Sequence, residues 1–226
     1  MKTITNFWNH FQQNNFVFLL LNEIPKNELK KHLDILMVQL HKYNPHLDII
    51  IKNKKTKAEL IITAHGNPYL FKDVELLVYH APKIKRWHIT AFLQPQLDIE
   101  QYEKGLDKAL NYYGISLRIS EMYFTLLPVP NKPFDFGIKV FLKNYFLYED
   151  HPRLQDAVFV QIEHLIGEKL FANTISFIEI DQLEIQKGYD YDLINLYYLH
   201  SYLETFLNSK IKNSLHLILS NHRNNS

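Results

Sequence analysis

Two residues in the segment WHIT, His88 and Thr90, have the types and spacing of half a catalytic motif. Two-histidine phosphoesterases pair two His-x-Thr or His-x-Ser elements, one histidine acting as general base and the other as general acid. No other histidine in the chain is followed two places later by Ser or Thr. We prefer to interpret the alternation as a half-buried strand with His88 and Thr90 on one face, and the catalytic half-motif is kept as the alternative.

The segment His65-Gly66-Asn67 precedes a helical pattern and could bind an anion. Free N–H groups and the helix dipole attract a phosphate or carboxylate to a helix N-terminus. However, neither GxGxxG nor GxxxxGKS or GxxxxGKT occurs in the sequence. The alternative is structural, with Gly66 making the turn and Asn67 capping the helix.

Two pairs of carboxylates lie two residues apart, Glu179 with Asp181 near a strand end and Asp190 with Asp192 near a helix start; the first pair could hold a metal ion, and the second is interpreted as helix-capping. On a strand, residues two apart face the same way, and paired carboxylates bind Mg²⁺ in phosphoryl-transfer enzymes. The sequence has no cysteine and neither HExxH nor HxxEH, so a zinc site is not indicated. We expect no cofactor. His164 and Glu168, four residues apart, predict only a pair on the polar flank of a helix.

Tyrosines are concentrated near the C-terminal end and could form a partner surface. Tyr191, Tyr198 and Tyr202 exceed what one core stripe of a helix requires. Tyrosine is favoured at interfaces because its ring buries a large area at low entropic cost. The alternative is a core stripe with a half-exposed rim.

Composition limits the classes of partner. The chain of 226 residues has 25 basic and 24 acidic residues, a net charge of +1, so no global field attracts nucleic acid. Basic clusters at 52–57 and 83–88 could contact an acidic partner or RNA, but the neutral net charge favours solvated loops. The longest apolar run near the N-terminus, at 16–21, is too short for a signal peptide or a membrane span. We therefore expect a cytoplasmic protein with no membrane partner.

Hydrophobic periodicity predicts the elements that must position these residues. Helices are expected over 5–21, 26–43 and 68–81, within 96–114, and over 152–170 and 189–209. Strands are expected over 47–52, 57–64, 87–93, 121–127, 136–143 and 173–180, with a possible last strand at 214–220. The first two strands form a hairpin, and so do the two that flank the proline-rich loop at 128–134.

The segments ELIITAHGNPYLFKDVELLVYHAPKIKRWHITAF and HPRLQDAVFVQIEHLIGEKL carry a family resemblance. In the first, a strand leads to a small residue and Gly, a helix ends in Ala-Pro, and Trp begins the next strand. With this order of elements the chain resembles a bacterial family of uncharacterised proteins, the domain of unknown function 695 or a close relative. The resemblance implies an α+β fold in a bacterial cytoplasmic protein and carries no activity to transfer.

These observations predict an α+β protein whose mainly antiparallel sheet is covered by helices, opening helix–helix–hairpin–helix–strand. We expect residues 1–226 to form one compact unit, with a seam near 128–134 and a loose tail at 221–226. The expected function is a non-enzymatic binding or protein-interaction module, whose partner is an unknown protein or a second copy. The alternative is a phosphoesterase or metal-dependent hydrolase that uses His65 and His88 or Glu179 and Asp181.

Overall fold

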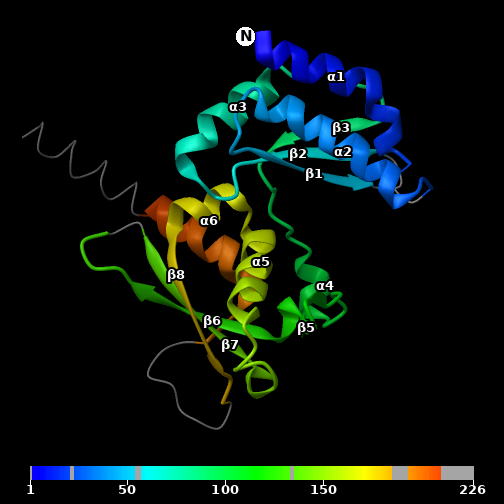
Figure 1. Ribbon diagram of the computed structural model, residues 1–226. Coiled ribbons are helices and arrows are strands. Elements are labelled where there is room, and N and C mark those ends of the chain that lie inside the picture. The colour runs from blue at the N-terminus through cyan, green and yellow to red at the C-terminus, as the bar shows by residue number, and fades with distance from the viewer. Residues whose placement is uncertain (1, 21–22, 54–56, 133–134, 185–192, 210–226) are drawn as a thin grey trace, which may run out of the picture. The chain divides into compact units, whose positions relative to one another are not determined.

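The computed structural model describes residues 2–20, 23–53, 57–132, 135–184 and 193–209 (Figure 1). The fold is α+β, and four of the six strand pairs in the described residues are antiparallel. Contacts between residues group the chain into two compact units, Met1–Gln94 and Pro95–Ser226, called unit 1 and unit 2 below. The seam expected near 128–134 lies inside unit 2, because the strands on either side of that loop pair with each other.

Unit 1 follows the predicted order helix–helix–hairpin–helix–strand. Its elements are α1 (Lys2–Phe18), α2 (Lys26–His41), β1 (Asp48–Asn53), β2 (Ala58–Thr63), the 3₁₀ turn η1 (Pro68–Leu70), α3 (Phe71–Tyr79) and β3 (Trp87–Ala91). β1 and β2 form the expected antiparallel hairpin, whereas β3 lies parallel to β2. The parallel pairing follows because α3 carries the chain back before β3 begins.

Aromatic side chains join the helices of unit 1 to its sheet. Trp87 at the start of β3 is buried, and its ring meets that of Phe11 edge to face at 4.9 Å. The indole N–H of Trp8 donates to the carbonyl of Leu77 in α3 at 2.9 Å. α1 and α2 lie on the same side of the sheet (Figure 1). These contacts bury the apolar stripe that the spacing of α1 predicted.

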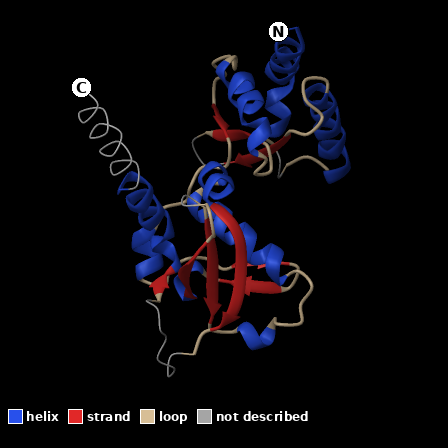
Figure 2. Cartoon of the chain, turned by 90° about the vertical axis from the view of Figure 1, so that its left-hand side faces the viewer, coloured by secondary structure: helices blue, strands red, loops and turns tan. Residues whose placement is uncertain are grey.

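Unit 2 contains a short hairpin and a four-stranded sheet packed against helices (Figure 2). Its elements are α4 (Ile99–Glu103), β4 (Leu110–Tyr112), β5 (Ile115–Leu117), η2 (Ile119–Glu121), β6 (Met122–Pro128), β7 (Phe136–Leu142), η3 (Tyr145–Leu147), α5 (Leu154–Ile166), α6 (Glu168–Thr174), β8 (Ile175–Gln182), β9 (Ile194–Asn195) and η4 (Leu196–Tyr198). A further helix spans 199–209. The larger sheet has the order β8-β7-β6-β9, with β8 parallel to β7 and the other pairs antiparallel.

The core of unit 2 forms where α5 meets the larger sheet. Val158 and Ile162 of α5 and Ile138 and Val140 of β7 are fully buried in one cluster. The alternation of β7 therefore places its apolar residues on the helix-covered face, as predicted. This packing also fixes the position of Gln161 on α5, which matters for the cavity described below.

The helix predicted over 152–170 is interrupted. Gly167 has a φ of 83° and ends α5, and a second helix begins at Glu168. Glycine adopts this left-handed region without the steric cost that a Cβ imposes. Glu168 is fully buried, so the expected position of its carboxylate on the polar surface of the helix is wrong.

The helix predicted over 189–209 begins later than expected. Ile194 and Asn195 form β9, which pairs with Phe124 and Tyr123 of β6. Pairing with β6 satisfies backbone groups that a helix would otherwise bond internally, so tertiary context overrides the local helical pattern. Residues 189–192, the possible strand at 214–220 and the expected tail at 221–226 lie outside the described residues. None of the described helices is long and apolar enough to cross a membrane.

Candidate functional site

His65 lies at the surface, where its Nε2 is 3.1 Å from Oδ2 of Asp48. Gly66, with a φ of 71°, makes the turn that follows. The side-chain oxygen of Asn67 accepts a hydrogen bond from the backbone N–H of Tyr69 at 3.1 Å, so the predicted capping role is confirmed. Asn67 is thus already bonded within the protein, and the 3₁₀ turn after it spans only Pro68–Leu70.

The structure does not bring His65 and His88 together. In the register of β3 against β2, exposed His88 lies opposite Glu59, whereas His65 follows Thr63 at the other end of β2. The four steps from Glu59 to Thr63 alone span about 13 Å of strand. Thr90 has a buried hydroxyl that makes no hydrogen bond to the described residues. The His-x-Thr segment therefore stays a half-motif in this structure.

A lysine lies at the proposed acidic metal pair. Nζ of Lys139 is 2.8 Å from Oδ2 of Asp181, and Lys139 is also the register partner of Glu179 in the parallel β7–β8 pair. Glu179 lines a cavity of about 450 Å³ together with Lys139, Glu149 and His151. Among the residues the structure describes, no three His, Asp or Glu side chains are grouped to hold a metal ion.

The tyrosines expected at a partner surface make contacts within unit 2. The hydroxyl of Tyr198 donates to Oε1 of Glu103 at 2.6 Å, and this bond raises the pKa of Tyr198 to about 12. The ring of Tyr202 meets that of Phe124 edge to face at 6.0 Å. Tyr198 and Tyr202 stay 39% and 43% exposed. Tyr191 lies outside the described residues, and a partner surface on this helix stays a prediction.

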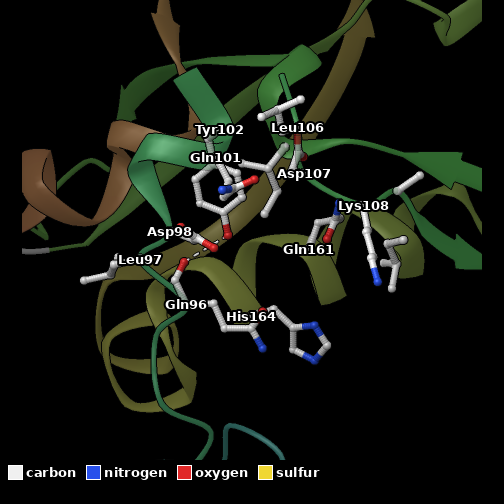
Figure 3. Close-up of a pocket in the computed structure, with 13 residues that line it drawn as sticks. Gln96, Leu97, Asp98, Gln101, Tyr102, Leu106, Asp107, Lys108, Gln161 and His164 are labelled. Carbon is white, nitrogen blue, oxygen red and sulfur yellow. Dashed lines mark hydrogen bonds between the residues drawn. The ribbon is translucent and has the colours of Figure 1, made fainter. Parts of the chain in front are cut away.

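A cavity of about 610 Å³ in unit 2 brings together polar residues that sequence reasoning missed (Figure 3). Its walls come from the segment around α4, from the loop leading to β4, from η2 and from α5. The residues used below are Gln96, Leu97, Asp98, Gln101, Tyr102, Leu106, Asp107, Lys108, Gln161 and His164.

Hydrogen bonds to backbone carbonyls hold the walls of this cavity in place. The hydroxyl of buried Tyr102 donates to the carbonyl of Gln96 at 3.1 Å, the dashed line in Figure 3. The backbone N–H of Gln96 in turn donates to the carbonyl of His164 on α5 at 3.0 Å. Buried Gln161 donates from Nε2 to the carbonyl of Leu117 at 3.0 Å. The segment before α4 is therefore tied to α5 by hydrogen bonds within the protein.

Asp107 is the most unusual residue of the cavity. Its Oδ2 accepts one long hydrogen bond, 3.3 Å, from the backbone N–H of Ser120. Its Oδ1 is buried and accepts no hydrogen bond from any described residue. A buried polar atom without a protein partner is rare in native proteins and indicates a bound water or ion, strain or a functional role.

Asp98 supplies a second carboxylate on the same cavity. It occupies the N-cap position of α4, yet its side chain caps no backbone N–H. Figure 3 shows Asp98 beside the hydroxyl of Tyr102. Burial, followed by the charges of Asp107 and Asp98, raises the pKa of the Tyr102 hydroxyl. Both carboxylates therefore act electrostatically on the same wall.

No sequence signal distinguished Asp98 and Asp107 in advance. Each of the two residues follows a leucine near the short helix α4. This pattern is not specific to the cavity, because Asp34 and Asp48 also follow leucines and do not line it. Gln161 and His164 are more than fifty residues away in the sequence, so their role depends on the packing of α5.

Comparison of the chain with models of protein families, with curated proteins and with solved structures found no match. The fold is α+β, and unit 2 contains a cavity with polar residues in its lining. The resemblance to the bacterial family stays a prediction.

Proposed function

We propose that this protein is a non-enzymatic binding protein and that the cavity of unit 2 accepts a small polar ligand. The observation that carries the proposal is the cavity itself, where the polar side chains of Asp98, Asp107 and Gln161 converge among apolar ones. Hydrogen bonds within the protein already hold its walls in place. A preformed site lowers the conformational cost of binding a ligand.

The size and lining of the cavity support the same function. Small-molecule sites are usually clefts of roughly 300–1,000 Å³ with apolar walls and a few convergent polar groups, and this cavity measures about 610 Å³. Leu97 and Leu106 are 48% and 63% exposed and provide apolar surface, while Asp98, Asp107 and Gln161 provide polar groups. The ligand would therefore have both an apolar and a polar part.

The phosphoesterase or hydrolase alternative stays a prediction with less geometric support. His65 and His88 lie near opposite ends of β2, and Lys139 lies beside Asp181 and in register with Glu179. An enzyme would need these groups to meet at one reacting atom. The binding proposal requires only the groups that already line one cavity.

Amide-resolved NMR of the full chain tests the proposal with a panel of small amines, neutral amides, sugars and carboxylic acids. We expect at least one compound to shift the amides of residues 96–110, together with those of Gln161 and His164. Ala109→Phe places a ring in the cavity and should abolish these shifts, because Ala109 is one of the lining residues. Ala172→Phe adds the same ring to a half-buried alanine of α6 outside the lining and should leave them unchanged.

Two outcomes would reject the binding proposal. In one, no compound of the panel shifts the cavity amides of the wild-type protein. In the other, shifts persist unchanged in Ala109→Phe while the far-ultraviolet circular dichroism of that variant shows an intact fold. Either result would mean that this cavity binds no small polar ligand.

A further inference from the structure

The two units carry opposite net charges, although the whole chain is nearly neutral. Unit 1 contains 13 basic and 7 acidic residues, a net charge of +6, whereas unit 2 contains 12 basic and 17 acidic residues, a net charge of −5. Both basic clusters of the sequence, at 52–57 and 83–88, belong to unit 1. Unit 1 therefore has a positive field that the composition of the whole chain conceals, and this field attracts acidic partners.

The fold brings residues of the two basic clusters together at one end of the sheet of unit 1. Ala58 lies beside Trp87 in the parallel register of β2 and β3, and the backbone N–H of Ala58 donates to the carbonyl of Arg86 at 2.8 Å. Lys57 directly precedes Ala58, so it is a close neighbour of the turn that contains Lys85 and Arg86. Cations about thirty residues apart in the sequence thus share one end of the sheet.

A cavity of about 460 Å³ lies at this end of the sheet and is called the basic cavity below. Its lining contains Lys57, Lys83 and Lys85 together with six apolar residues, and none of the described lining residues is acidic. Val78 and Ile84 of this lining are only half-buried, so part of their apolar surface is open to a partner. The basic cavity therefore combines apolar surface with three positive charges.

The cations of the basic cavity are not neutralised within the protein. Lys57, Lys83 and Lys85 are exposed, and none of them forms an ion pair with any residue that the structure describes. The unbound protein therefore holds several like charges close together, and these charges repel one another. An anionic partner neutralises them, which favours its binding at this place.

Arg86 adds a cation next to the basic cavity in a conformation that favours glycine. Its φ is 71°, and its side chain is exposed. This left-handed region is sterically unfavourable for a residue with a Cβ, whereas glycine adopts it freely. The turn before β3 thus keeps a charged side chain where glycine would relieve the strain, and such positions are concentrated at functional sites.

We infer that the basic cavity docks an acidic peptide segment of a partner protein, with one apolar side chain in the cavity and carboxylates that face Lys57, Lys83 and Lys85. This surface belongs to unit 1 and does not depend on the ligand site proposed in unit 2. A peptide spreads several negative charges along its length, so it can reach more of these lysines than a small anion can. Trp87 is buried, so its ring offers no face on which a nucleic-acid base could stack.

Three pentapeptides separate charge from apolar contact in NMR titrations of the full chain. Ac-EEFEE-NH2 carries acidic residues on both sides of one aromatic anchor, Ac-QQFQQ-NH2 keeps the anchor without the charge, and Ac-EEGEE-NH2 keeps the charge without the anchor. We expect Ac-EEFEE-NH2 to shift the amides of residues 57–58 and 78–89. It should bind about tenfold more tightly than either of the others, because it combines burial of a ring with several exposed ion pairs.

Salt provides a second measure of the ionic contribution. Raising the NaCl concentration from about 0.05 M to about 0.5 M should weaken the binding of Ac-EEFEE-NH2 several-fold, since salt screens exposed charges. The binding of Ac-QQFQQ-NH2 should not weaken, because this peptide carries no charge.

Two double variants of equal charge locate the site. Lys83→Glu with Lys85→Glu reverses two charges of the lining and should lower the affinity for Ac-EEFEE-NH2 about tenfold or more. Lys30→Glu with Lys31→Glu makes the same change at exposed positions of α2 in unit 1 and should change the affinity by no more than about twofold. Arg86→Gly should lower the affinity about threefold without lowering Tm, so it keeps the test valid if the first double variant folds poorly.

Three outcomes would overturn this inference. In the first, the three peptides bind with equal affinity. In the second, both double variants lose affinity equally, which would mean that only the overall charge of unit 1 attracts the peptide. In the third, oligothymidylate or oligouridylate binds at the same amides more tightly than Ac-EEFEE-NH2, which would identify a nucleic-acid surface instead. None of these outcomes affects the ligand site proposed in unit 2, because the amides of residues 96–110 report on that site separately.

Discussion

At the scale of single residues, charged groups near α4 are either paired or face the cavity. The phenol of Tyr198 donates to Glu103 at 2.6 Å, and this hydrogen bond is the main cause of its raised pKa, about 12. Glu103 therefore bonds to Tyr198 and is not among the cavity-lining residues. Its neighbours Gln101 and Tyr102 on the same short helix do line the cavity. The neutral phenol of Tyr198 therefore orients the carboxylate of Glu103 without removing its charge.

The Tyr198–Glu103 bond predicts a specific titration. The folded pKa lies above the ordinary value of 10.0, so the stability that this bond contributes is fully present below pH 10 and is lost as the pH rises through about 12. In Glu103→Gln the pKa of Tyr198 should fall back toward 10, because the neighbouring negative charge is gone. The tyrosinate absorbance of wild type minus that of Tyr198→Phe measures this single group.

Glu100→Gln is the matched control for this titration. It removes a carboxylate from the same helix, but one that pairs with Lys104 instead of Tyr198. The titration of Tyr198 should stay unchanged in this variant. A wild-type Tyr198 that titrates near 10 would show that the hydrogen bond to Glu103 does not form in solution.

At the scale of elements, the pairing of β7 with β8 depends on a glycine. The parallel register shifts between Phe136 and Gly137, and the ring of Phe177 lies over Gly137. A Cβ added at Gly137 would overlap that ring. Glycine lowers the stability of β7 through its conformational entropy, but no larger residue leaves room for the ring of Phe177 from β8.

Gly137→Ala should destabilise the protein by about 1–3 kcal/mol, because Phe177 must move from its position over β7. In a Phe177→Ala background the same change should be neutral or stabilising by roughly 0.5–1 kcal/mol, since alanine loses less conformational entropy than glycine. Urea unfolding of the wild type, both single variants and the double variant measures this coupling. Additive effects of the two substitutions would contradict the contact.

At the scale of the whole molecule, two cores can be followed separately. Both tryptophans of the chain, Trp8 and Trp87, are buried in unit 1. The large cluster around α5 contains only residues of unit 2, from Tyr102 to Leu203. Tryptophan fluorescence therefore reports on unit 1, whereas circular dichroism reports on helices and strands of both units.

We expect urea unfolding of the full chain to give different transitions with these two probes. Each unit has its own core, and two-state behaviour is the property of single cooperative domains. The fluorescence curve should show one transition and the far-ultraviolet circular dichroism curve two. Coincident curves would show that the two units unfold as one cooperative structure.

Local patterns predicted most of the elements. The sequence predicted the apolar faces of α1, α2 and α5 from residue spacing. It also predicted the hairpin of β1 and β2 and the cap at Asn67. Each of these features depends on residues close in sequence. The start of the last helix was predicted too early, because it depends on residues distant in the sequence. Ile194 and Asn195 pair with β6, about seventy residues earlier, and no local signal encodes that partner.

The sequence by itself determined the α+β class, because hydrophobic periodicity depends on residues close in the chain. Motif spacing is also read from neighbouring residues, and it selected the candidates His65, His88, Glu179 and Asp181. The tertiary structure decided that these candidates do not converge and that Asp98, Asp107, Gln161 and His164 line one cavity. The physical reason is that a cavity forms from surfaces left between packed elements. Which carboxylate is left there without a partner depends on neighbours distant in the chain.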